Sequence, residues 1–183
     1  MATIALDLGS GTKPNNYFDA DVVIGLDLID SPGSQIIKCN LFDGEIPFSS
    51  NSVNYVTAFD FLEHLPRTYT KLHPFPNTVN SFILLMNEVN RVLVQGGKFF
   101  HRTPVFPHPE AFTDPTHVNI MTEATMFYFA KVPPGPTPLD LDTTDDAWSF
   151  VKPLATTYGI STSLTLMQSY KESFYLCQLF TKD

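Results

Sequence analysis

The chain has 183 residues, 43% of them hydrophobic, and a formal charge of -8, which suits one globular domain of about 100 to 200 residues. The acidic balance disfavours nucleic acid as a partner, because proteins that bind a phosphate backbone usually carry a basic face. No apolar run reaches the roughly 18 residues of a membrane-spanning helix, and the first residues lack the layout of a signal peptide. Cys39 and Cys177 form neither a disulfide framework nor a metal-ligand cluster, which predicts a reducing, cytoplasmic compartment.

The first strand-like run, residues 3–8, breaks into a Gly-x-Gly turn at Gly9 and Gly11, and a second run, residues 22–26, ends on Asp27. In a parallel sheet both strand ends meet at the same edge, so the turn and the carboxylate are expected to lie together. Glycine lets the turn adopt left-handed angles and approach a ligand closely. A carboxylate at Asp27 can accept hydrogen bonds from both hydroxyls of a ribose. The arrangement predicts a nucleoside site.

A dinucleotide fold is one alternative for this turn. It requires a third glycine that packs a helix onto the strand, and here Pro14 occupies that position, after Lys13. A diphosphate also needs a full helix N-terminus, but only residues 12–21 separate the turn from the next run. The sequence therefore disfavours a nicotinamide oxidoreductase.

The rest of the chain alternates between strand and helix patterns. The expected elements are strands at 35–39, 53–59 and 98–103, a helix over 80–94, a short helix at 122–130, and two alternating runs at 161–168 and 174–181. We expect Asn77 or Thr78 to cap the long helix and Gly96 or Gly97 to stop it. Alternation of strand and helix through residue 104 predicts a parallel, doubly wound sheet.

Four segments in order carry recognisable motifs: residues 6–11 (LDLGSG), 46–56 (IPFSSNSVNYV), 61–65 (FLEHL) and 87–98 (NEVNRVLVQGGK). They resemble motif I, the "LPF-x-D-x-SFD-x-V" stretch, the "VLEHL" and the "E-x-x-RVLKPGG" of class I S-adenosylmethionine-dependent methyltransferases of the methyltransferase type 11-like kind. The resemblance implies an α/β, Rossmann-like three-layer sandwich with a seven-stranded mixed sheet. Its strand order is 3-2-1-4-5-7-6, with an antiparallel last pair.

The family usually has helices before the first strand, and we expect this chain to depart from it there, because its first strand-like run begins at residue 3. We expect one domain over residues 1–183, with a cofactor-binding core at 1–104, a variable cover or substrate insertion at 105–160, and a closing hairpin at 161–183. The connection between the first two strands holds at most two turns of helix at about 3.6 residues per turn. We therefore expect the insertion to fold over the pocket, or a second subunit of a homodimer to cover the thin face.

The resemblance also implies S-adenosylmethionine as cofactor, S-adenosylhomocysteine as its product, and a small-molecule acceptor that takes the methyl group by in-line displacement. Carried over residue by residue, the cofactor contacts are Asp7, Gly9, Ser10 and Gly11 beside the methionine part, Asp27 and Leu28 beside the ribose, Asn40 and Leu41 beside the adenine, and Phe59 and Asp60 at the pocket floor. Asn40 stands where the family often has Asp, and its carbonyl oxygen can accept a hydrogen bond from the adenine amino group. A cofactor-binding protein without turnover would use the same residues and stays open as the alternative.

Histidine is the residue type suited to removing a proton from the acceptor near neutral pH, and His64, His101, His108 and His117 are the candidates near the ends of the fourth and fifth strands. His64 is first by position, with an orienting role in the "EHL" motif as the competing interpretation. His117 lies in a "DPTH" segment similar to one that follows the fifth strand in some methyltransferases of this type. Asp114 either orients His117 or shapes a turn.

Two other roles at this site remain open. Glu63 is either a base or a structural hydrogen-bonding residue. A metal held by Asp114, His108 and His117 would lack a helical i,i+4 ligand pair, so the sequence leads us to expect no metal.

Overall fold

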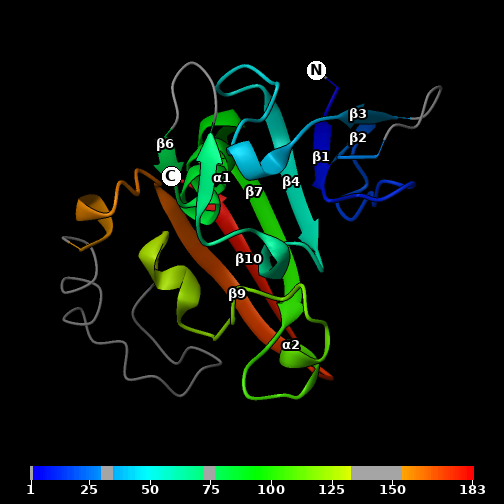
Figure 1. Ribbon diagram of the computed structural model, residues 1–183. Coiled ribbons are helices and arrows are strands. Elements are labelled where there is room, and N and C mark those ends of the chain that lie inside the picture. Colours follow the sequence, from blue (N-terminus) through cyan, green and yellow to red (C-terminus); the bar gives the residue numbers. More distant parts are fainter. Residues whose placement is uncertain (1, 30–34, 72–76, 133–153) are drawn as a thin grey trace.

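The computed structural model describes residues 2–29, 35–71, 77–132 and 154–183 (Figure 1). Its strands are β1 (Ile4–Leu8), β2 (Val22–Asp27), β3 (Ile36–Lys38), β4 (Val53–Phe59), β5 (Tyr69–Lys71), β6 (Asn77–Val79), β7 (Leu93–Pro104), β8 (Ala130–Lys131), β9 (Leu164–Glu172) and β10 (Tyr175–Lys182). The helices are α1 (Ser81–Val92) and α2 (Glu110–Thr113), with 3-10 turns η1 (Leu41–Asp43), η2 (Leu62–His64) and η3 (Thr125–Tyr128). A further helical segment covers residues 154–157.

Eight strands form one twisted mixed sheet in the order β3-β2-β1-β4-β7-β10-β9-β8 (Figure 1). The pairs from β3 to β7 are parallel, whereas β10 runs antiparallel to both β7 and β9. The predicted order is confirmed, since β7, β10 and β9 are the expected fifth, seventh and sixth strands. The predicted count was one strand short: β8 pairs with β9 at the edge, and a strand of two residues has no alternation for a pattern to detect.

Helix α1 packs on one face of this sheet through a stripe of buried side chains: Phe82, Leu85, Met86, Val89 and Val92. They share a core with Leu8, Val56 and Phe99 of the central strands. The helix cap is Asn80, whose side chain accepts a hydrogen bond from the Ile83 amide at 3.1 Å. The expectation of Asn77 or Thr78 was wrong, because both residues belong to β6. The chain passes from α1 directly into β7 at Leu93, so the expected stop at Gly96 or Gly97 lies inside a strand.

The opposite face is covered by the loop of residues 9–21 instead of a helix. Successive strand residues point to opposite faces, so Phe100, next to the core residue Phe99, faces this loop. The Tyr17 ring stacks on Phe100 with 4.2 Å between centroids, and Phe18 stacks on Tyr55 at 4.6 Å. Two aromatic side chains thus form the thin third layer on this side.

The "E-x-x-R" motif of α1 fixes the loop that precedes β4. Arg91 bonds Glu88 through Nε and Nη2, at 2.6 and 2.7 Å, and donates to the carbonyls of Phe48 and Ile46 at 2.8 and 2.9 Å. Glu88 in turn accepts from the Ile46 amide at 3.0 Å. The motif is therefore a clamp between the helix and the entry to the fourth strand of the chain.

The expected insertion packs against the segment that follows β4. The amides of Val118 and Asn119 both donate to the Glu63 carbonyl, at 2.8 and 3.0 Å, and the Asn119 side chain donates to the carbonyls of Leu62 and Leu65. The helix expected at 122–130 is shorter than predicted. Only η3 forms there, because the chain enters β8 at Ala130. Residues 133–153 of the expected cover lie outside the described residues. None of the helices in the described ranges has the length and apolarity that a membrane crossing requires.

Candidate functional site

The glycine turn after β1 and the carboxylate at the end of β2 are joined by hydrogen bonds. Gly9 and Gly11 have φ of 66° and 59°, in the left-handed region that favours glycine. The Gly9 amide donates to the Leu26 carbonyl at 2.9 Å. Asp27 accepts from the Gly11 amide through Oδ2 at 2.8 Å and from the Ile29 amide through Oδ1 at 3.0 Å. The carboxylate therefore points toward the turn.

A cavity of about 140 Å³ opens beside this turn. It is lined by Gly9, Asp27, Leu28, Cys39, Leu41, Phe42, Phe61 and His64, so four of the ten predicted cofactor residues meet there. The cavity is small against the roughly 300–1,000 Å³ of pockets for drug-sized ligands. One cause is Phe61, whose ring lies so close to Gly9 that a Cβ on Gly9 would collide with it.

Asn40 is not among the residues that line this cavity. Its side chain caps η1 by accepting from the Phe42 amide at 3.2 Å and donates to Asp43 and Tyr69 at 3.0 and 3.1 Å. A second cavity of about 410 Å³ is lined by Asn40 and also by Cys39, so the two cavities adjoin at Cys39. Burial and the nearby Asp27 raise the pKa of the Cys39 thiol to about 11, which keeps this wall neutral.

Asp7 and Ser10 make internal contacts beside the cavity. Asp7 accepts from Thr57 Oγ1 at 2.6 Å and from the Asn15 amide at 2.8 Å, so it ties the loop of residues 9–21 to β4. Burial raises the pKa of Asp7, against the lowering effect of these two bonds. The Ser10 side chain packs against Gly25 of β2.

Phe59 and Asp60 contact the sheet face opposite α1. The Phe59 ring lies 5.4 Å from that of Phe100. Asp60 has a positive φ of 49° and forms an ion pair with Arg102. The Arg102 guanidinium lies over the Tyr175 ring at 4.2 Å from its centroid. Neither Phe59 nor Asp60 lines the cavity beside the glycine turn.

Three titratable side chains meet at the edge of this cavity: Glu63 and His64 from η2, and His117 from the "DPTH" segment. One donor atom of each lies within 4.8 Å of the other two, and the two imidazole rings are 4.7 Å apart. His64 also lines the cavity beside the turn. The structure thus brings both predicted catalytic histidines together. His101 and His108 lie elsewhere: His101 is fully buried inside β7, and His108 stacks on Phe174 at 5.3 Å.

Asp114 orients His64 through Thr116. The Thr116 hydroxyl donates to Asp114 Oδ1 at 2.7 Å, so its oxygen accepts from the Nδ1–H of His64 at 2.9 Å. This tautomer leaves Nε2 of His64 unprotonated. Burial, followed by the charge of His117, lowers the pKa of His64, which also favours the neutral ring. Sequence reasoning missed Thr116, although it stands inside the "DPTH" segment.

Glu63 is almost fully buried, with 2% of its surface exposed. Its Oε2 accepts from the Thr103 hydroxyl at 3.0 Å, whereas Oε1 has no hydrogen-bond partner among the described residues. Burial raises the pKa of Glu63 to about 7, against the lowering effects of hydrogen bonds and of His117. His117 Nδ1 is likewise buried and without a partner in the described part of the chain.

Neither a family model nor a curated protein matches the sequence, but solved structures match the fold. A SAM-dependent methyltransferase from Archaeoglobus fulgidus is similar over 99% of this chain and 86% of its own, with a TM-score of 0.55 and 11% identity. An S-adenosylmethionine-dependent methyltransferase from Mesorhizobium loti is similar over 99% of this chain and 91% of its own, with a TM-score of 0.50 and 15% identity. The [4+2]-cyclase SpnF is similar over 99% of this chain and 74% of its own, with a TM-score of 0.55 and 11% identity.

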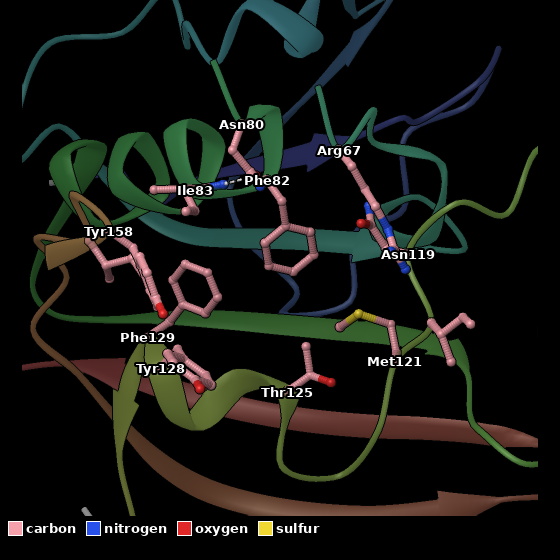
Figure 2. Close-up of a pocket in the computed structure, with 12 residues that line it drawn as sticks. Arg67, Asn80, Phe82, Ile83, Asn119, Met121, Thr125, Tyr128, Phe129 and Tyr158 are labelled. Carbon is pink, nitrogen blue, oxygen red and sulfur yellow. Dashed lines mark hydrogen bonds between the residues drawn. The ribbon is translucent and has the colours of Figure 1, made fainter. Parts of the chain in front are cut away.

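This is the S-adenosylmethionine-dependent methyltransferase fold. Within this methyltransferase fold, a further cavity of about 330 Å³ lies between α1 and η3 (Figure 2). Figure 2 shows Phe82 of α1 and Phe129 near each other in this cavity, with 5.3 Å between ring centroids. Arg67 and Asn119 stand together at one end. Most of the side chains that line the cavity are aliphatic or aromatic.

Proposed function

We propose that the protein transfers a methyl group from S-adenosylmethionine to a small-molecule acceptor. The observation that carries this proposal is the Asp27 carboxylate, held beside the Gly9 turn by the amides of Gly11 and Ile29. Parallel sheets bind nucleotides at the carboxyl ends of their strands, where the strand order reverses. Here that reversal falls between β1 and β4. The methyltransferase fold supports the same cofactor.

The cofactor site extends across the two cavities that adjoin at Cys39. The methionine part occupies the space beside Gly9, the ribose hydroxyls meet Asp27, and the adenine lies near Leu41 and Asn40. Because the Phe61 ring packs on Gly9, it rotates away as the cofactor enters. The amide of Asn40 keeps one lone pair on Oδ1 for the adenine amino group after capping η1.

The acceptor site is the cavity between α1 and η3. Its walls carry aromatic and aliphatic side chains, and Arg67 at one end offers hydrogen-bond donors. The amide of Asn119 donates to Leu62 and Leu65, so it offers its oxygen as an acceptor. Small-molecule sites commonly combine an apolar lining with a few polar groups that fix orientation. A wall shared by the two sites comes from η2 and the residues after Asp114, because His64 lines one cavity and Arg67 and Asn119 line the other.

Methyl transfer requires the acceptor, the methyl carbon and the sulfur to be collinear, so most of the rate enhancement comes from positioning. The sulfonium charge disappears as the methyl leaves, and an apolar wall favours that change. An acceptor that carries a proton must also be activated. We assign this activation to His64 and His117, with Asp114 holding His64 through Thr116.

Calorimetry with S-adenosylmethionine and S-adenosylhomocysteine tests the cofactor site. We expect Asp27→Ala to weaken both by about 1 to 3 kcal/mol, because a charge-assisted acceptor is lost and the turn loses its hydrogen bond from the Gly11 amide. Asp21→Ala is the matched control. Asp21 directly precedes β2, whereas Asp27 ends it, and Asp21 accepts a hydrogen bond from the Thr3 amide. Equal affinities for the wild type and Asp27→Ala would refute the ribose assignment.

Cofactor binding without methyl transfer is the second candidate, because it would use the same residues, and one neighbour of the same fold is named for a reaction other than methyl transfer. Release of S-adenosylhomocysteine in the presence of a panel of small acceptors separates the two. Tight binding with no release for any acceptor, under conditions where a known methyltransferase turns over, would favour the second candidate.

We further propose a single domain over residues 1–183, a cytoplasmic location and a homodimer that covers the thin face. On the face opposite α1, Tyr17, Met167 and Tyr170 have 45%, 57% and 40% of their surface exposed. A second copy seated there would bury these side chains. Light scattering at several protein concentrations tests this proposal, and a mass of one chain at all concentrations would contradict it.

A further inference from the structure

We propose that Glu63, His64 and His117 bind one divalent transition-metal ion. Two imidazoles and one carboxylate are a ligand set that zinc and non-haem iron use in catalytic sites with open positions. From the sequence we expected no metal, because the ligand set weighed there was Asp114, His108 and His117. The fold instead brings His117 to η2, where consecutive residues Glu63 and His64 supply the other two ligands.

The first argument is that buried polar atoms in this cluster have no partner within the described residues. Glu63 is 2% exposed, and its Oε1 makes no hydrogen bond; His117 Nδ1 is also buried and unpartnered. A buried carboxylate oxygen without a hydrogen bond is costly, so such atoms are usually satisfied by a ligand, an ion or water. The two atoms belong to neighbouring side chains of one cluster, so a single cation satisfies both.

The second argument is that the surrounding residues orient the ligands. His64 donates from Nδ1 to Thr116, whose hydroxyl is held by Asp114, and Nε2 is left with a lone pair. Metal-binding histidines typically donate their other N–H to an oxygen that fixes the ring in this way. Thr103 does the same for Glu63 by donating to Oε2. Each of these two ligands therefore has a fixed partner behind it.

The spacing is compatible with one ion. The three donor atoms lie within 4.8 Å of one another, while donors around zinc at about 2.1 Å are roughly 3.4 Å apart in a tetrahedral site. Small rotations of the two partly exposed imidazole rings close this difference. Three protein ligands leave a coordination position for an acceptor oxygen, which deepens the proposed function: the ion is the means by which this wall activates the acceptor.

Calorimetry with Zn²⁺ on tag-free, chelator-treated protein tests the site, with Co²⁺ absorption as a second readout of the ligand set. We expect one ion per chain and a visible Co²⁺ spectrum. Glu63→Gln and His117→Asn should each abolish detectable binding. Thr116→Val should weaken it about 10- to 100-fold, because it removes the partner of His64. His108→Asn, a histidine stacked on Phe174 outside the cluster, should bind as the wild type does.

Circular dichroism and melting temperature show whether each variant is folded, and His117→Asn, on a surface segment, serves if Glu63→Gln does not fold. Wild-type protein that binds no Zn²⁺, or binding that survives in both variants, would overturn the inference. The readout is the bound ion, so the metal site can fail while S-adenosylmethionine still binds. Conversely, failure of the cofactor to bind would refute the proposed function and leave the ion measurement unaffected.

Discussion

Phe61 occupies the space above Gly9, and this contact makes the two glycines of the turn different. Both need a left-handed backbone, but a Cβ on Gly9 would meet the Phe61 ring, whereas nothing lies within 4 Å of a Cβ on Gly11. We expect Gly11→Ala to lower the free energy of unfolding by about 1 to 2 kcal/mol through backbone strain alone. Gly9→Ala should cost about 1 to 3 kcal/mol more through overpacking.

Urea unfolding of the two variants measures this difference. In the background of Phe61→Ala the extra cost of Gly9→Ala should largely vanish, as a double-mutant cycle would show. The same Phe61→Ala background should also speed association with S-adenosylhomocysteine, because the ring no longer has to rotate. A Gly9→Ala penalty that stays the same without the ring would mean that Phe61 is not the obstacle.

His101 is a second residue whose surroundings give a measurable result. It is fully buried in β7, where Gln178 accepts from its Nε2–H at 3.1 Å. Burial lowers the pKa of His101 to about 4, from an ordinary value of 6.5, against the raising effect of Gln178. Between these two pH values the unfolded chain binds the proton and the folded chain does not, so stability rises with pH in this window.

We therefore expect the free energy of unfolding to fall as pH is lowered from about 6.5 to about 4, with about 3 kcal/mol from His101. His101→Phe keeps a ring next to those of Phe99 and Phe180 but removes the proton site. It should be less stable at pH 7, because Gln178 loses its donor, and should show a shallower pH slope. Urea unfolding at several pH values compares the two, and parallel slopes would exclude His101 as the source.

At the scale of elements, the clamp between α1 and the loop before β4 depends on the planar fork of Arg91. The guanidinium reaches Glu88 and two backbone carbonyls at once, which a lysine cannot do. We expect Arg91→Lys to lower the free energy of unfolding by about 1 to 3 kcal/mol. Lys98→Ala, on an exposed position of β7, should change it little. A thermal melt that ranks the two variants equally would contradict this role.

The elements themselves were predictable where a periodic pattern or a motif defined them. The strand order came from the resemblance of four segments to a known family, whereas the apolar spacing of β1, β2 and α1 located those elements along the chain. The cap of α1 was misplaced because β5 and β6 form a small separate hairpin just before it, and three-residue strands leave no periodic signal. The aromatic layer of Tyr17 and Phe18 was also out of reach, since only tertiary packing shows where a loop side chain lies.

The site was predictable to the extent that strand ends determine it. Gly9, Gly11 and Asp27 meet because parallel strands finish at one edge. The cluster of Glu63, His64 and His117 was only partly visible in the sequence, because His117 stands more than fifty positions after the other two. The backbone bonds of Val118 and Asn119 to Glu63 bring it to them. The family motif placed each histidine on its own segment, but the pairing between segments is a tertiary contact.

For the whole molecule, ligand binding and stability are linked, because a ligand that binds only the folded chain shifts unfolding by mass action. A cofactor at 100 times its dissociation constant adds about 2.7 kcal/mol, and each kcal/mol raises the melting temperature of a chain of this size by about 2 to 4 °C. We expect S-adenosylhomocysteine to raise it by roughly 5 to 10 °C, and Asp27→Ala to reduce that shift at the same concentration. NAD should give no shift, because Pro14 stands where a dinucleotide fold needs glycine. Protection by NAD but not by S-adenosylhomocysteine would favour an oxidoreductase over a methyltransferase, since the same glycine turn would then be holding a diphosphate.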